Sequence, residues 1–321
     1  MRNIKPSEVV LITGATGTLG TELISQLTQT GARIRGFSRD EAKQADLRRR
    51  FPSVDFILGD VRDPRACRAA VQGVDVVIHA ASLKYVDVSE LQPTEYALTN
   101  VLGTINMIAA VNHEPSVRRM VGISTDKACA PFNTYGLTKG LLEKFFMEAH
   151  QNRRGENQTE YTVARYGNVL GSRGSVVPIW AEARKTGKPI KVTDPTMTRF
   201  FFTIADAVTL IDISLEASGG SIIAKMMPAA TLKDLALVMA EGEVGSLPPV
   251  PVEIIGRRPG EKPHEDLLSA HEMWRTSRIA DFFFYHPLGE PLLPPLLPAY
   301  TSAVARQLSL RELRSMVSPW L

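Results

Sequence analysis

Short apolar runs of strand length alternate with longer helix-periodic stretches through the first half of the chain, and this alternation limits the available folds more than any other feature. The runs are apolar along most of their length, as in strands that are covered on both faces of a sheet. Such strands alternating with helices are typical of parallel βαβ units. The sequence therefore predicts an α/β fold built on a doubly wound parallel sheet, with strands at Val9–Thr13, Arg33–Phe37, Asp55–Leu58, Val74–His79, Arg119–Ser124 and Tyr161–Arg165.

The regular alternation ends after Tyr166, where segments rich in Gly, Ser, Arg and Thr follow. We interpret residues 1–167 as the domain of the main sheet, and residues 168–321 as a smaller, interleaved C-terminal domain that binds substrate, together with a tail. Residues 199–215 alternate first as a strand and then as an apolar-faced helix, so the chain is expected to rejoin the main sheet by about 200–216. The prolines of Pro287–Pro298 predict an extended surface connection.

The composition is that of an ordinary folded protein, since 44% of the residues are hydrophobic and 22% are charged. The net charge of +3 is small and evenly spread, which does not indicate nucleic-acid binding. Cys67 and Cys129 are the only cysteines and lie far apart, which favours a reducing compartment over a disulfide scaffold or a cysteine zinc site. The first apolar stretch, Val9–Ile12, is shorter than a signal-peptide core or a membrane span, so we expect a cytoplasmic protein without membrane insertion.

The motifs of several other enzyme classes are missing from the sequence. The histidines show neither H-E-x-x-H nor another clustered ligand spacing, so no metal site is expected. There is also no G-x-x-x-x-G-K-[ST] phosphate loop and no G-x-S-x-G nucleophile elbow. These absences argue against a metallohydrolase, a kinase and a serine hydrolase.

A glycine-rich turn joins the first predicted strand to a helical stretch over residues 21–29. Glycines allow a tight turn and close backbone approach, and a helix N-terminus offers free N–H groups and a positive dipole to a pyrophosphate. The spacing is G-x-x-G-x-x-G rather than the G-x-G-x-x-G of many dehydrogenases, but strand, turn and helix follow in the order that dinucleotide binding needs. We therefore expect a Rossmann-type cofactor site that begins with Thr13, Gly14, Thr16, Gly17, Thr18, Leu19 and Gly20. A glycine-rich turn selected for packing is the alternative.

The residues after the second predicted strand favour NADP over NAD as the cofactor. An acidic residue at this place would hold the ribose 2′-hydroxyl of NAD, but Ser38 and Arg39 stand there instead. A guanidinium beside a hydroxyl suits a 2′-phosphate. Asp40 and Glu41 follow directly, so NAD and a solvated charge cluster are the alternatives. Four residues after the third and fourth strands are expected beside the adenine and the middle of the cofactor: Asp60, Val61, Ala80 and Ala81.

Tyr135 and Lys139 follow the fifth predicted strand and open a helical stretch that extends through Ala149. A spacing of four residues puts both side chains on one face of a helix. An ammonium beside a phenol stabilises the tyrosinate and lowers the pKa of the phenol, which prepares Tyr135 to act as a base toward an alcohol. A Y-x-x-x-K pattern is common by chance, but its place after the fifth strand of a dinucleotide-binding fold makes it specific. Both residues are also expected to contact the cofactor.

Several segments together resemble the extended short-chain dehydrogenase/reductases that act on nucleotide sugars. Beside T-G-x-x-G-x-x-G and Y-x-x-x-K, the more specific segments are SRDE (Ser38–Glu41), HAASLK (His79–Lys84), STDKA (Ser124–Ala128), RYGNVLGSRGSVVP (Arg165–Pro178), MTRF (Met197–Phe200) and IIGRRPGEKPHE (Ile254–Glu265). They span residues 10 to 265, and Tyr300–Val317 fits the usual end of the family. Within the family, the chain is similar to the inverting UDP-N-acetylglucosamine 4,6-dehydratases of bacterial surface-sugar pathways. Dehydratases that retain the C5 configuration carry STDE where this chain has Lys127.

The resemblance implies a catalytic cycle in which NADP is regenerated at each turn. Tyr135 would take the proton of the C4 hydroxyl of UDP-N-acetylglucosamine, while Lys139 holds the ribose and Thr125 orients the hydroxyl. Lys127, with a pKa depressed by partial desolvation, would remove the C5 proton, and Asp126 would protonate the departing C6 hydroxyl. Hydride return to C6 and protonation of C5 from the opposite face would give a 6-deoxy-4-keto sugar with inverted C5. An ordinary salt-bridged loop pair is the alternative reading of Asp126 and Lys127.

The resemblance also implies a set of residues that bind the substrate. Lys84 is expected near the catalytic region, and the residues expected toward the diphosphate and uracil are Asn168, Arg173, Ser175, Arg199, Arg258 and Glu261. Arginine forks suit phosphate geometry, and Glu261 either orders the loop of Arg258 or contacts the nucleotide. Family members commonly assemble, so a homo-oligomer is expected. Two rival functions stay open, namely a nucleotide-sugar epimerase, which would leave Lys127 without a role, and a non-catalytic NADP-binding sensor. The loop Cys129–Phe132 departs from the pattern of the family and leaves fine specificity and subunit contacts open.

Overall fold

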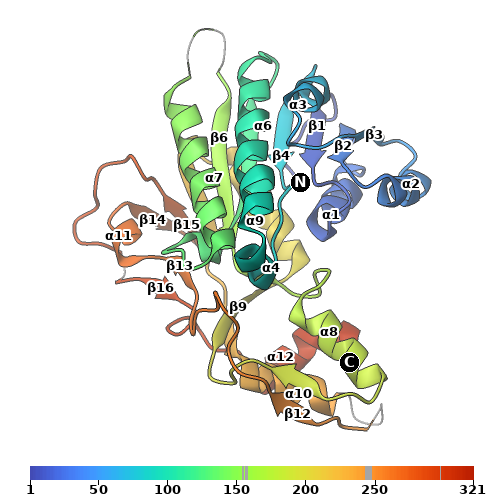
Figure 1. The fold of residues 1–321 in the computed structure, drawn as a ribbon. Helices are drawn as coiled ribbons and strands as arrows, with labels where there is room; N and C mark the ends of the chain where they lie inside the picture. The colour runs from blue at the N-terminus through green and yellow to red at the C-terminus, as the bar shows by residue number, and fades with distance from the viewer. Residues whose placement is uncertain (154, 156–157, 243–247, 297) are drawn as a thin grey trace.

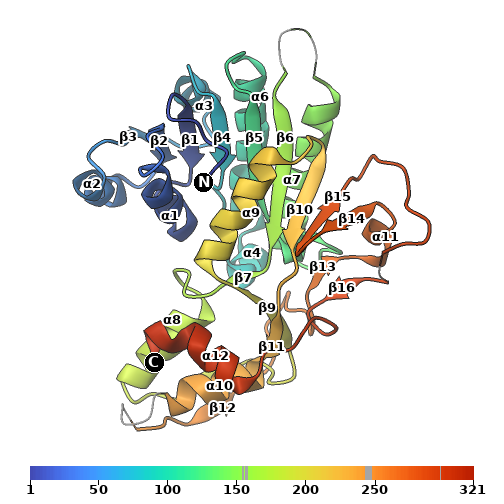
Figure 2. The ribbon, with the colours of Figure 1, turned by 180° about the vertical axis from the view of Figure 1, so that it is seen from behind.

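A large, mostly parallel sheet forms the centre of the molecule (Figure 1, Figure 2). The computed structural model describes residues 1–153, 155, 158–242, 248–296 and 298–321. In this part of the chain the sheet has nine strands in the order β14-β15-β10-β6-β5-β4-β1-β2-β3, and β15 pairs antiparallel with both β10 and β14. The strands are β1 Val9–Thr13, β2 Arg33–Ser38, β3 Asp55–Leu58, β4 Val76–His79, β5 Arg119–Thr125, β6 Glu160–Tyr166, β10 Ser221–Lys225, β14 Thr276–Ile279 and β15 Phe282–Tyr285.

The predicted α/β fold is confirmed, and all six predicted strands lie in this sheet within two residues of their predicted bounds. The reason is visible in β1 and β4, whose residues are buried throughout. Helices cover both faces of the sheet, so these strands need apolar side chains on either side.

Helices α6 and α7 pack side by side on one face of the sheet, and α1 and α9 pack together on the other (Figure 1, Figure 2). Their arrangement is that of a doubly wound fold, in which ligands bind at the carboxyl ends of the parallel strands. The helices of this body are α1 Thr18–Leu27, α2 Glu41–Arg50, α3 Pro64–Val71, α4 Val86–Leu91, α5 Pro93–Tyr96, the π-helix η1 Ala97–Leu102, α6 Gly103–Asn112, the 3₁₀ helix η2 Asp126–Ala128, α7 Thr134–Gln151 and α9 Ile204–Glu216.

A smaller body lies beyond the carboxyl ends of the parallel strands and has its own apolar core, which includes Trp180, Leu235 and Leu313 (Figure 1). Strand β9 connects it to the main body. Its elements are β7 Asn168–Val169, α8 Val176–Lys185, β8 Ile190–Val192, β9 Thr198–Phe202, β11 Ala229–Thr231, α10 Leu232–Glu241, β12 Val252–Ile254, α12 Leu310–Val317 and the 3₁₀ helix η3 Ser318–Trp320. Beside the antiparallel edge of the main sheet lie β13 Asp266–Leu268, α11 Ala270–Met273 and β16 Tyr300–Thr301 (Figure 2).

The predicted boundary at residue 168 does not separate the main sheet from the rest of the chain, because three later strands belong to that sheet. The helix at 204–216 does return to the main sheet, but β10, β14 and β15 lie after it and also pair within that sheet. Their apolar runs carry no sign of which sheet they join, because register and partner are set by long-range packing. The described residues of Pro287–Pro298 lie mostly at the surface, but they form turns, bends and irregular chain in place of the predicted extended connection. In the described residues, no helix combines the length and the apolar character that a membrane crossing needs.

Candidate active site

The glycine-rich turn packs so closely that side chains would not fit at two of its positions. Gly14 has a φ of +69°, and a Cβ there would lie 2.9 Å from the backbone of Ala80. A Cβ at Gly20 would lie 2.5 Å from the carbonyl oxygen of Gly14. Helix α1 begins directly after Gly17, so its first N–H groups face the turn without a side-chain cap. This cradle fits the pyrophosphate of a dinucleotide.

Thr13 has a different place from the one predicted. Its side chain is fully buried, and its hydroxyl lies 2.9 Å from Nδ1 of His79 and accepts a hydrogen bond from the N–H of Ala81. Thr13 therefore holds the loop after β4 against the glycine-rich turn instead of lining the cavity. Burial also lowers the pKa of His79 to about 3, which keeps the imidazole neutral in this contact.

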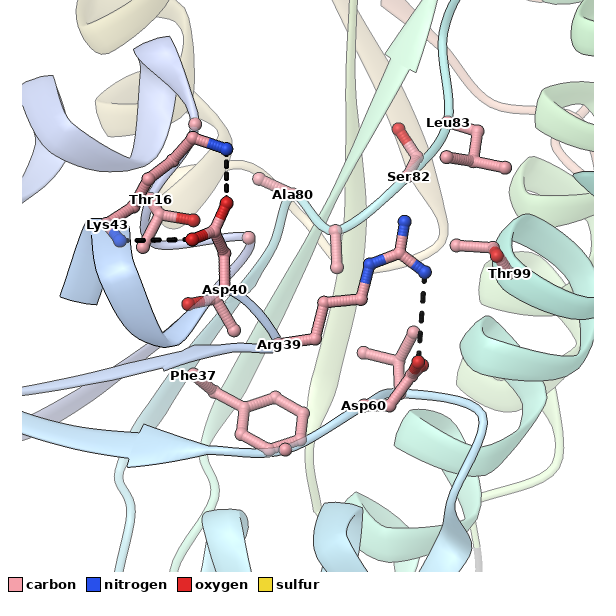
Figure 3. Close-up of a pocket in the computed structure, with 16 residues that line it drawn as sticks. Thr16, Phe37, Arg39, Asp40, Lys43, Asp60, Ala80, Ser82, Leu83 and Thr99 are labelled. Atoms are coloured by element: carbon pink, nitrogen blue, oxygen red, sulfur yellow. Dashed lines mark hydrogen bonds and ion pairs between the residues drawn. The ribbon is translucent and has the colours of Figure 1, made fainter.

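A first cavity of about 300 Å³ lies at the ends of β1, β2, β3 and β4 (Figure 3). Arg39 reaches across it, with its guanidinium 3.8 Å from the carboxylate of Asp60. Asp40 instead caps α2 and pairs with Lys43. The guanidinium of Arg39 therefore faces the cavity, while the charge of the neighbouring Asp40 is balanced by Lys43. The residues predicted to bind the cofactor that line this cavity are Gly14, Thr16, Gly17, Ser38, Arg39, Asp60, Val61, Ala80 and Ala81.

A second cavity of about 530 Å³ adjoins the first and shares Gly14, Gly17 and Ala80 with it. It brings together residues from the glycine-rich turn, the ends of β4 and β5, helix α7 and the loop before α8. The predicted residues in its wall are Thr18, Leu19, Gly20, Lys84, Thr125, Lys127, Tyr135, Lys139, Asn168, Arg173 and Ser175. A site that joins a dinucleotide cradle to a tyrosine and two lysines is equipped for oxidation and proton transfer at an alcohol.

Tyr135 and Lys139 both lie in the first turns of α7, which Asn133 caps by accepting a hydrogen bond from the N–H of Gly136. Burial raises the pKa of Tyr135 to about 12, and the main opposing cation is Lys127. The pKa of Tyr135 is therefore raised and not lowered as predicted, and Lys139 is not among the main groups that set it. Burial lowers the pKa of Lys139 itself to about 8, which weakens the charge it can offer.

Lys127 is held between two carboxylates. Its Nζ lies 3.1 Å from Oδ1 of Asp126 and 3.1 Å from Oε1 of Glu265. Burial disfavours the ammonium, but these two anions outweigh it and raise the pKa of Lys127 above its usual value. The predicted depression of the Lys127 pKa is therefore wrong. The sequence pairs Lys127 with Asp126, but nothing in it indicates that Glu265 contacts Lys127 as well.

Asp126 stands behind Lys127 and not in the cavity wall. Its side chain is fully buried, and Oδ1 accepts hydrogen bonds from Thr125 and Lys127. Oδ2 has no hydrogen-bond partner in the described part of the chain. Burial raises the pKa of Asp126, with Lys127 as the main opposing charge, so this carboxyl accepts a proton more readily than an exposed aspartate does.

A third cavity of about 620 Å³ lies in the smaller body and is lined by Asn168, Arg199, Arg258 and Glu261, together with residues of α8 and β8. Arg199 is buried and donates to the carbonyl groups of Thr198 and Pro263. Arg258 is exposed, and its N–H donates to the carboxylate of Glu261, so Glu261 orders this loop.

Two residues that line the second cavity have a buried polar atom without a hydrogen-bond partner in the described residues, namely Oδ1 of Asn168 and Oγ of Ser175. Ser175 is the N-cap residue of α8. Buried polar groups normally have a partner, so these atoms mark a place where a polar ligand would complete the structure. Glu265 is the residue of the site that the sequence analysis missed, although it ends the segment IIGRRPGEKPHE.

Comparison with known proteins places this site in a family. A family model described as "Polysaccharide biosynthesis protein" matches residues 10–287. UDP-glucose 4-epimerases of Rickettsia rickettsii and Rickettsia canadensis are 36% and 37% identical, and each match covers 97% of this chain and 95% of the relative.

Solved structures agree on the fold. The structure of Pen from Bacillus thuringiensis is 34% identical and covers 98% of both chains, with a TM-score of 0.92. The dTDP-glucose 4,6-dehydratase DesIV from Streptomyces venezuelae, solved with NAD and TYD bound, is 20% identical and covers 79% of this chain and 86% of its own, with a TM-score of 0.70. This chain therefore belongs to the polysaccharide biosynthesis protein family and has the nucleotide-sugar epimerase and dehydratase fold of the extended short-chain dehydrogenase/reductases.

Proposed function

We propose that this protein dehydrates UDP-N-acetylglucosamine to a UDP-2-acetamido-2,6-dideoxy-4-keto-hexose with inverted C5, using NADP. The observation that carries the proposal is the position of Lys127, which lines the same cavity as Tyr135 and contacts two buried carboxylates. An oxidation and reduction at C4 alone needs only the tyrosine and its neighbours. A lysine with carboxylate partners adds the means to move the proton of a neighbouring carbon.

The first part of the reaction is oxidation at C4. A nicotinamide dinucleotide held by the glycine-rich turn and Arg39 would supply oxidation of C4 and, after elimination, reduction of C6. Tyr135 takes the proton of the C4 hydroxyl. Thr125, which hydrogen-bonds to Tyr135 and lines the cavity, orients that hydroxyl.

The second part is elimination across C5 and C6, and it needs Lys127 as a neutral amine. Transfer of one proton from Nζ of Lys127 to Oδ1 of Asp126 creates that amine without changing the net charge of the pair. The amine takes the C5 proton, and the electron pair of that C–H bond forms the C5–C6 double bond. The C6–O bond breaks, and the oxygen leaves as water with the proton of Asp126, which Thr125 passes on from behind the cavity wall. C5 then takes a proton from solvent on the opposite face, which inverts its configuration, and Tyr135 releases the proton of the C4 hydroxyl to solvent.

The substrate and cofactor assignments have separate support. The space next to the catalytic cavity suits a nucleoside diphosphate, because its walls include Arg199, Arg258, Asn168 and Ser175. Arg39 faces the first cavity and suits a 2′-phosphate, which favours NADP over the NAD found in the DesIV structure.

A nucleotide-sugar epimerase is the second candidate. The 36% identity to the UDP-glucose 4-epimerase of Rickettsia rickettsii favours it, because the match covers nearly the whole of both chains. An epimerase would use Tyr135 and Lys139 and give no 6-deoxy product.

The two candidates differ in the product formed in deuterated water. The purified protein is incubated with UDP-N-acetylglucosamine and NADP, and the sugar is followed by proton NMR. We expect a new methyl signal and deuterium at an inverted C5. A changed C4 centre without a methyl signal would show an epimerase, and no change with any nucleotide sugar would contradict both activities.

Lys127→Ala gives the matched variant for this experiment. We expect it to bind NADP like the wild type but to show neither C5 deuterium exchange nor dehydration. Wild-type turnover in Lys127→Ala would contradict the proposed role of this residue.

A further inference from the structure

Glu265 is a buried carboxylate that contacts the catalytic cluster from a distant part of the chain. It follows the loop of Arg258 and Glu261, and its side chain is only 3% exposed. Its Oε1 lies 3.1 Å from Nζ of Lys127, while Oε2 is buried without a hydrogen-bond partner in the residues that the structure describes. Two buried carboxylates therefore contact the same ammonium, and the desolvation of these three charged groups costs free energy of folding.

The contacts form one continuous chain through the site. Tyr135 hydrogen-bonds to Thr125, and Thr125 donates to Asp126 over 2.9 Å. Lys127 then joins Asp126 to Glu265. In this series of contacts, Glu265 stands at the opposite end from Tyr135.

The two carboxylates differ in their surroundings. Nε of Arg199, from β9, lies 3.7 Å from Oε1 of Glu265, and Lys262 adds a second positive charge from the loop of Glu265 itself. Burial opposes the ionisation of Glu265, but Lys127 and Arg199 outweigh it and lower the pKa of Glu265. Asp126 has Lys127 as its main cation, and its pKa is raised by burial and by the charge of Glu265. Glu265 therefore stays ionised where Asp126 accepts a proton.

We propose that Glu265 is a positioning residue whose fixed negative charge retains the proton that Asp126 and Lys127 share, and so sets the pH range in which this pair works. The charged and titratable groups that face the pair are Glu265, Arg199 from β9, Lys262 from the loop before β13 and Tyr135 from α7. Of these, Glu265 is the anion in contact with Lys127 besides Asp126.

The proton balance of the pair explains the expected effect. In the resting cluster, Asp126 and Glu265 carry one negative charge each, and Lys127 and Arg199 carry one positive charge each. Transfer of the Nζ proton to Asp126 breaks an N–H bond, forms an O–H bond and leaves the total charge at zero, with Glu265 still opposite Arg199. Without the charge of Glu265, both Asp126 and Lys127 lose protons at lower pH.

The inference rests on the proposed function only where it concerns turnover, so its first test needs no substrate. The pKa of Lys127 is measured in the whole protein by competitive acetylation with acetic anhydride across a pH series, followed by mass spectrometry of the peptide. We expect Glu265→Gln to lower this pKa by about one pH unit or more. Asp266→Asn is the matched control, because it removes the next carboxylate in the chain, which pairs with Lys262 instead, and we expect no change.

The second test is the pH profile of C5 deuterium exchange in UDP-N-acetylglucosamine with NADP. Both limbs of the profile should move to lower pH in Glu265→Gln, with the KM within about a factor of three of the wild type. Glu265→Asp keeps the charge, so its limbs should stay close to those of the wild type even where kcat falls.

If Glu265 had a structural role alone, Glu265→Gln would lower the rate of C5 exchange at every pH without moving the limbs of the pH profile, and that result would overturn the proposal. An unchanged Lys127 pKa in folded Glu265→Gln would overturn it as well. If Glu265→Gln does not fold, Glu265→Ala decides, since it also removes the negative charge, and an unchanged Lys127 pKa in folded Glu265→Ala would overturn the inference. A wild type that forms no 6-deoxy sugar would refute the proposed function. The acetylation measurement would still test whether Glu265 sets the pKa of Lys127, because it needs no substrate.

Discussion

At the scale of single residues, Lys139 links stability to pH, because it is a lysine buried to 2% exposure. Burial lowers its pKa from 10.5 to about 8. Below about pH 8 the folded and unfolded chains both hold the proton, and the folded state bears the full burial cost. Between about pH 8 and 10.5 only the unfolded chain holds it, so the cost disappears as the pH rises.

We therefore expect the stability of the cofactor-free protein to rise across this range relative to Lys139→Met, which has no titrating group. The difference in the free energy of unfolding should grow by at most about 3 kcal/mol. Urea unfolding of both proteins at several pH values measures it. A constant difference would show that Lys139 keeps an ordinary pKa in the folded protein.

Arg39 decides the cofactor in our reading. Arg39→Ala should weaken NADP binding by roughly 10- to 100-fold, the value of a charge-assisted hydrogen bond, and should change NAD binding much less. Calorimetric titration with each dinucleotide measures both. Arg62→Ala is the control, because Arg62 also pairs with Asp60 but does not line the cavity. Equal losses for NADP and NAD would remove the basis for the NADP assignment.

The sequence predicted Arg39 and missed Glu265 for one physical reason. Arg39 follows a strand directly, so its place at the carboxyl edge of the sheet is set locally. The contact between Lys127 and Glu265 depends on how a loop of the smaller body packs against η2, and a single sequence carries no sign of it. Together with Asp126, Glu265 raises the pKa of Lys127, which is opposite to the expected direction.

At the scale of elements, a buried ion cluster joins β6, α7 and α11. Arg165 is 1% exposed and donates to Glu143 of α7 and to Glu272 of α11, with two hydrogen bonds to each. Ser124 of β5 also donates to Glu143. The cluster ties the middle of α7, the helix that carries Tyr135, to strands β5 and β6 of the sheet.

Arg165→Met should destabilise the protein by about 3–5 kcal/mol, because it leaves two buried carboxylates without their cation. Chemical denaturation measures this loss. Arg119→Met is the comparison, since Arg119 lies on the neighbouring strand and its side chain donates to the carbonyl of Ala217 and to no carboxylate among the described residues. A loss in Arg165→Met no larger than that of Arg119→Met would show that the cluster adds little to stability.

The elements themselves were predictable wherever a strand is buried on both faces, as β1 and β4 are. The edge formed by β14 and β15 was not, because antiparallel pairing at an edge depends on which strand the fold leaves open. Sequence periodicity reports burial but not the neighbour that provides it.

At the scale of the whole molecule, the site depends on contact between the two bodies. The N–H of Arg173, from the loop before α8, donates to Thr18 at the start of α1, and Lys84 donates to the carbonyl of Arg173. These contacts bring a loop of the substrate side over the glycine-rich turn. The second cavity therefore has walls from both bodies, and a shift between them would change the cofactor and substrate sites together.

The outer face of α6 and α7 is the feature that bears on assembly. Its exposed apolar residues are Leu98, Leu102, Ile105, Leu137 and Leu141, which come from η1, α6 and α7. Helices α6 and α7 lie side by side (Figure 1), so these residues share one surface. A contiguous apolar surface of this kind is typical of a subunit interface.

We expect the protein to form a homo-oligomer through this face. Leu102→Glu combined with Ile105→Glu should convert it to a monomer, because two charges would be buried without partners. Sedimentation velocity measures the mass, and circular dichroism checks that the variant is folded. The control is Ile279→Glu on the edge strand β14, where the exposed isoleucine lies outside the α6–α7 face. Loss of the oligomer in Ile279→Glu alone would place the interface at the open edge of the sheet, and a monomeric wild type would show that the apolar face of α6 and α7 is not a self-association surface.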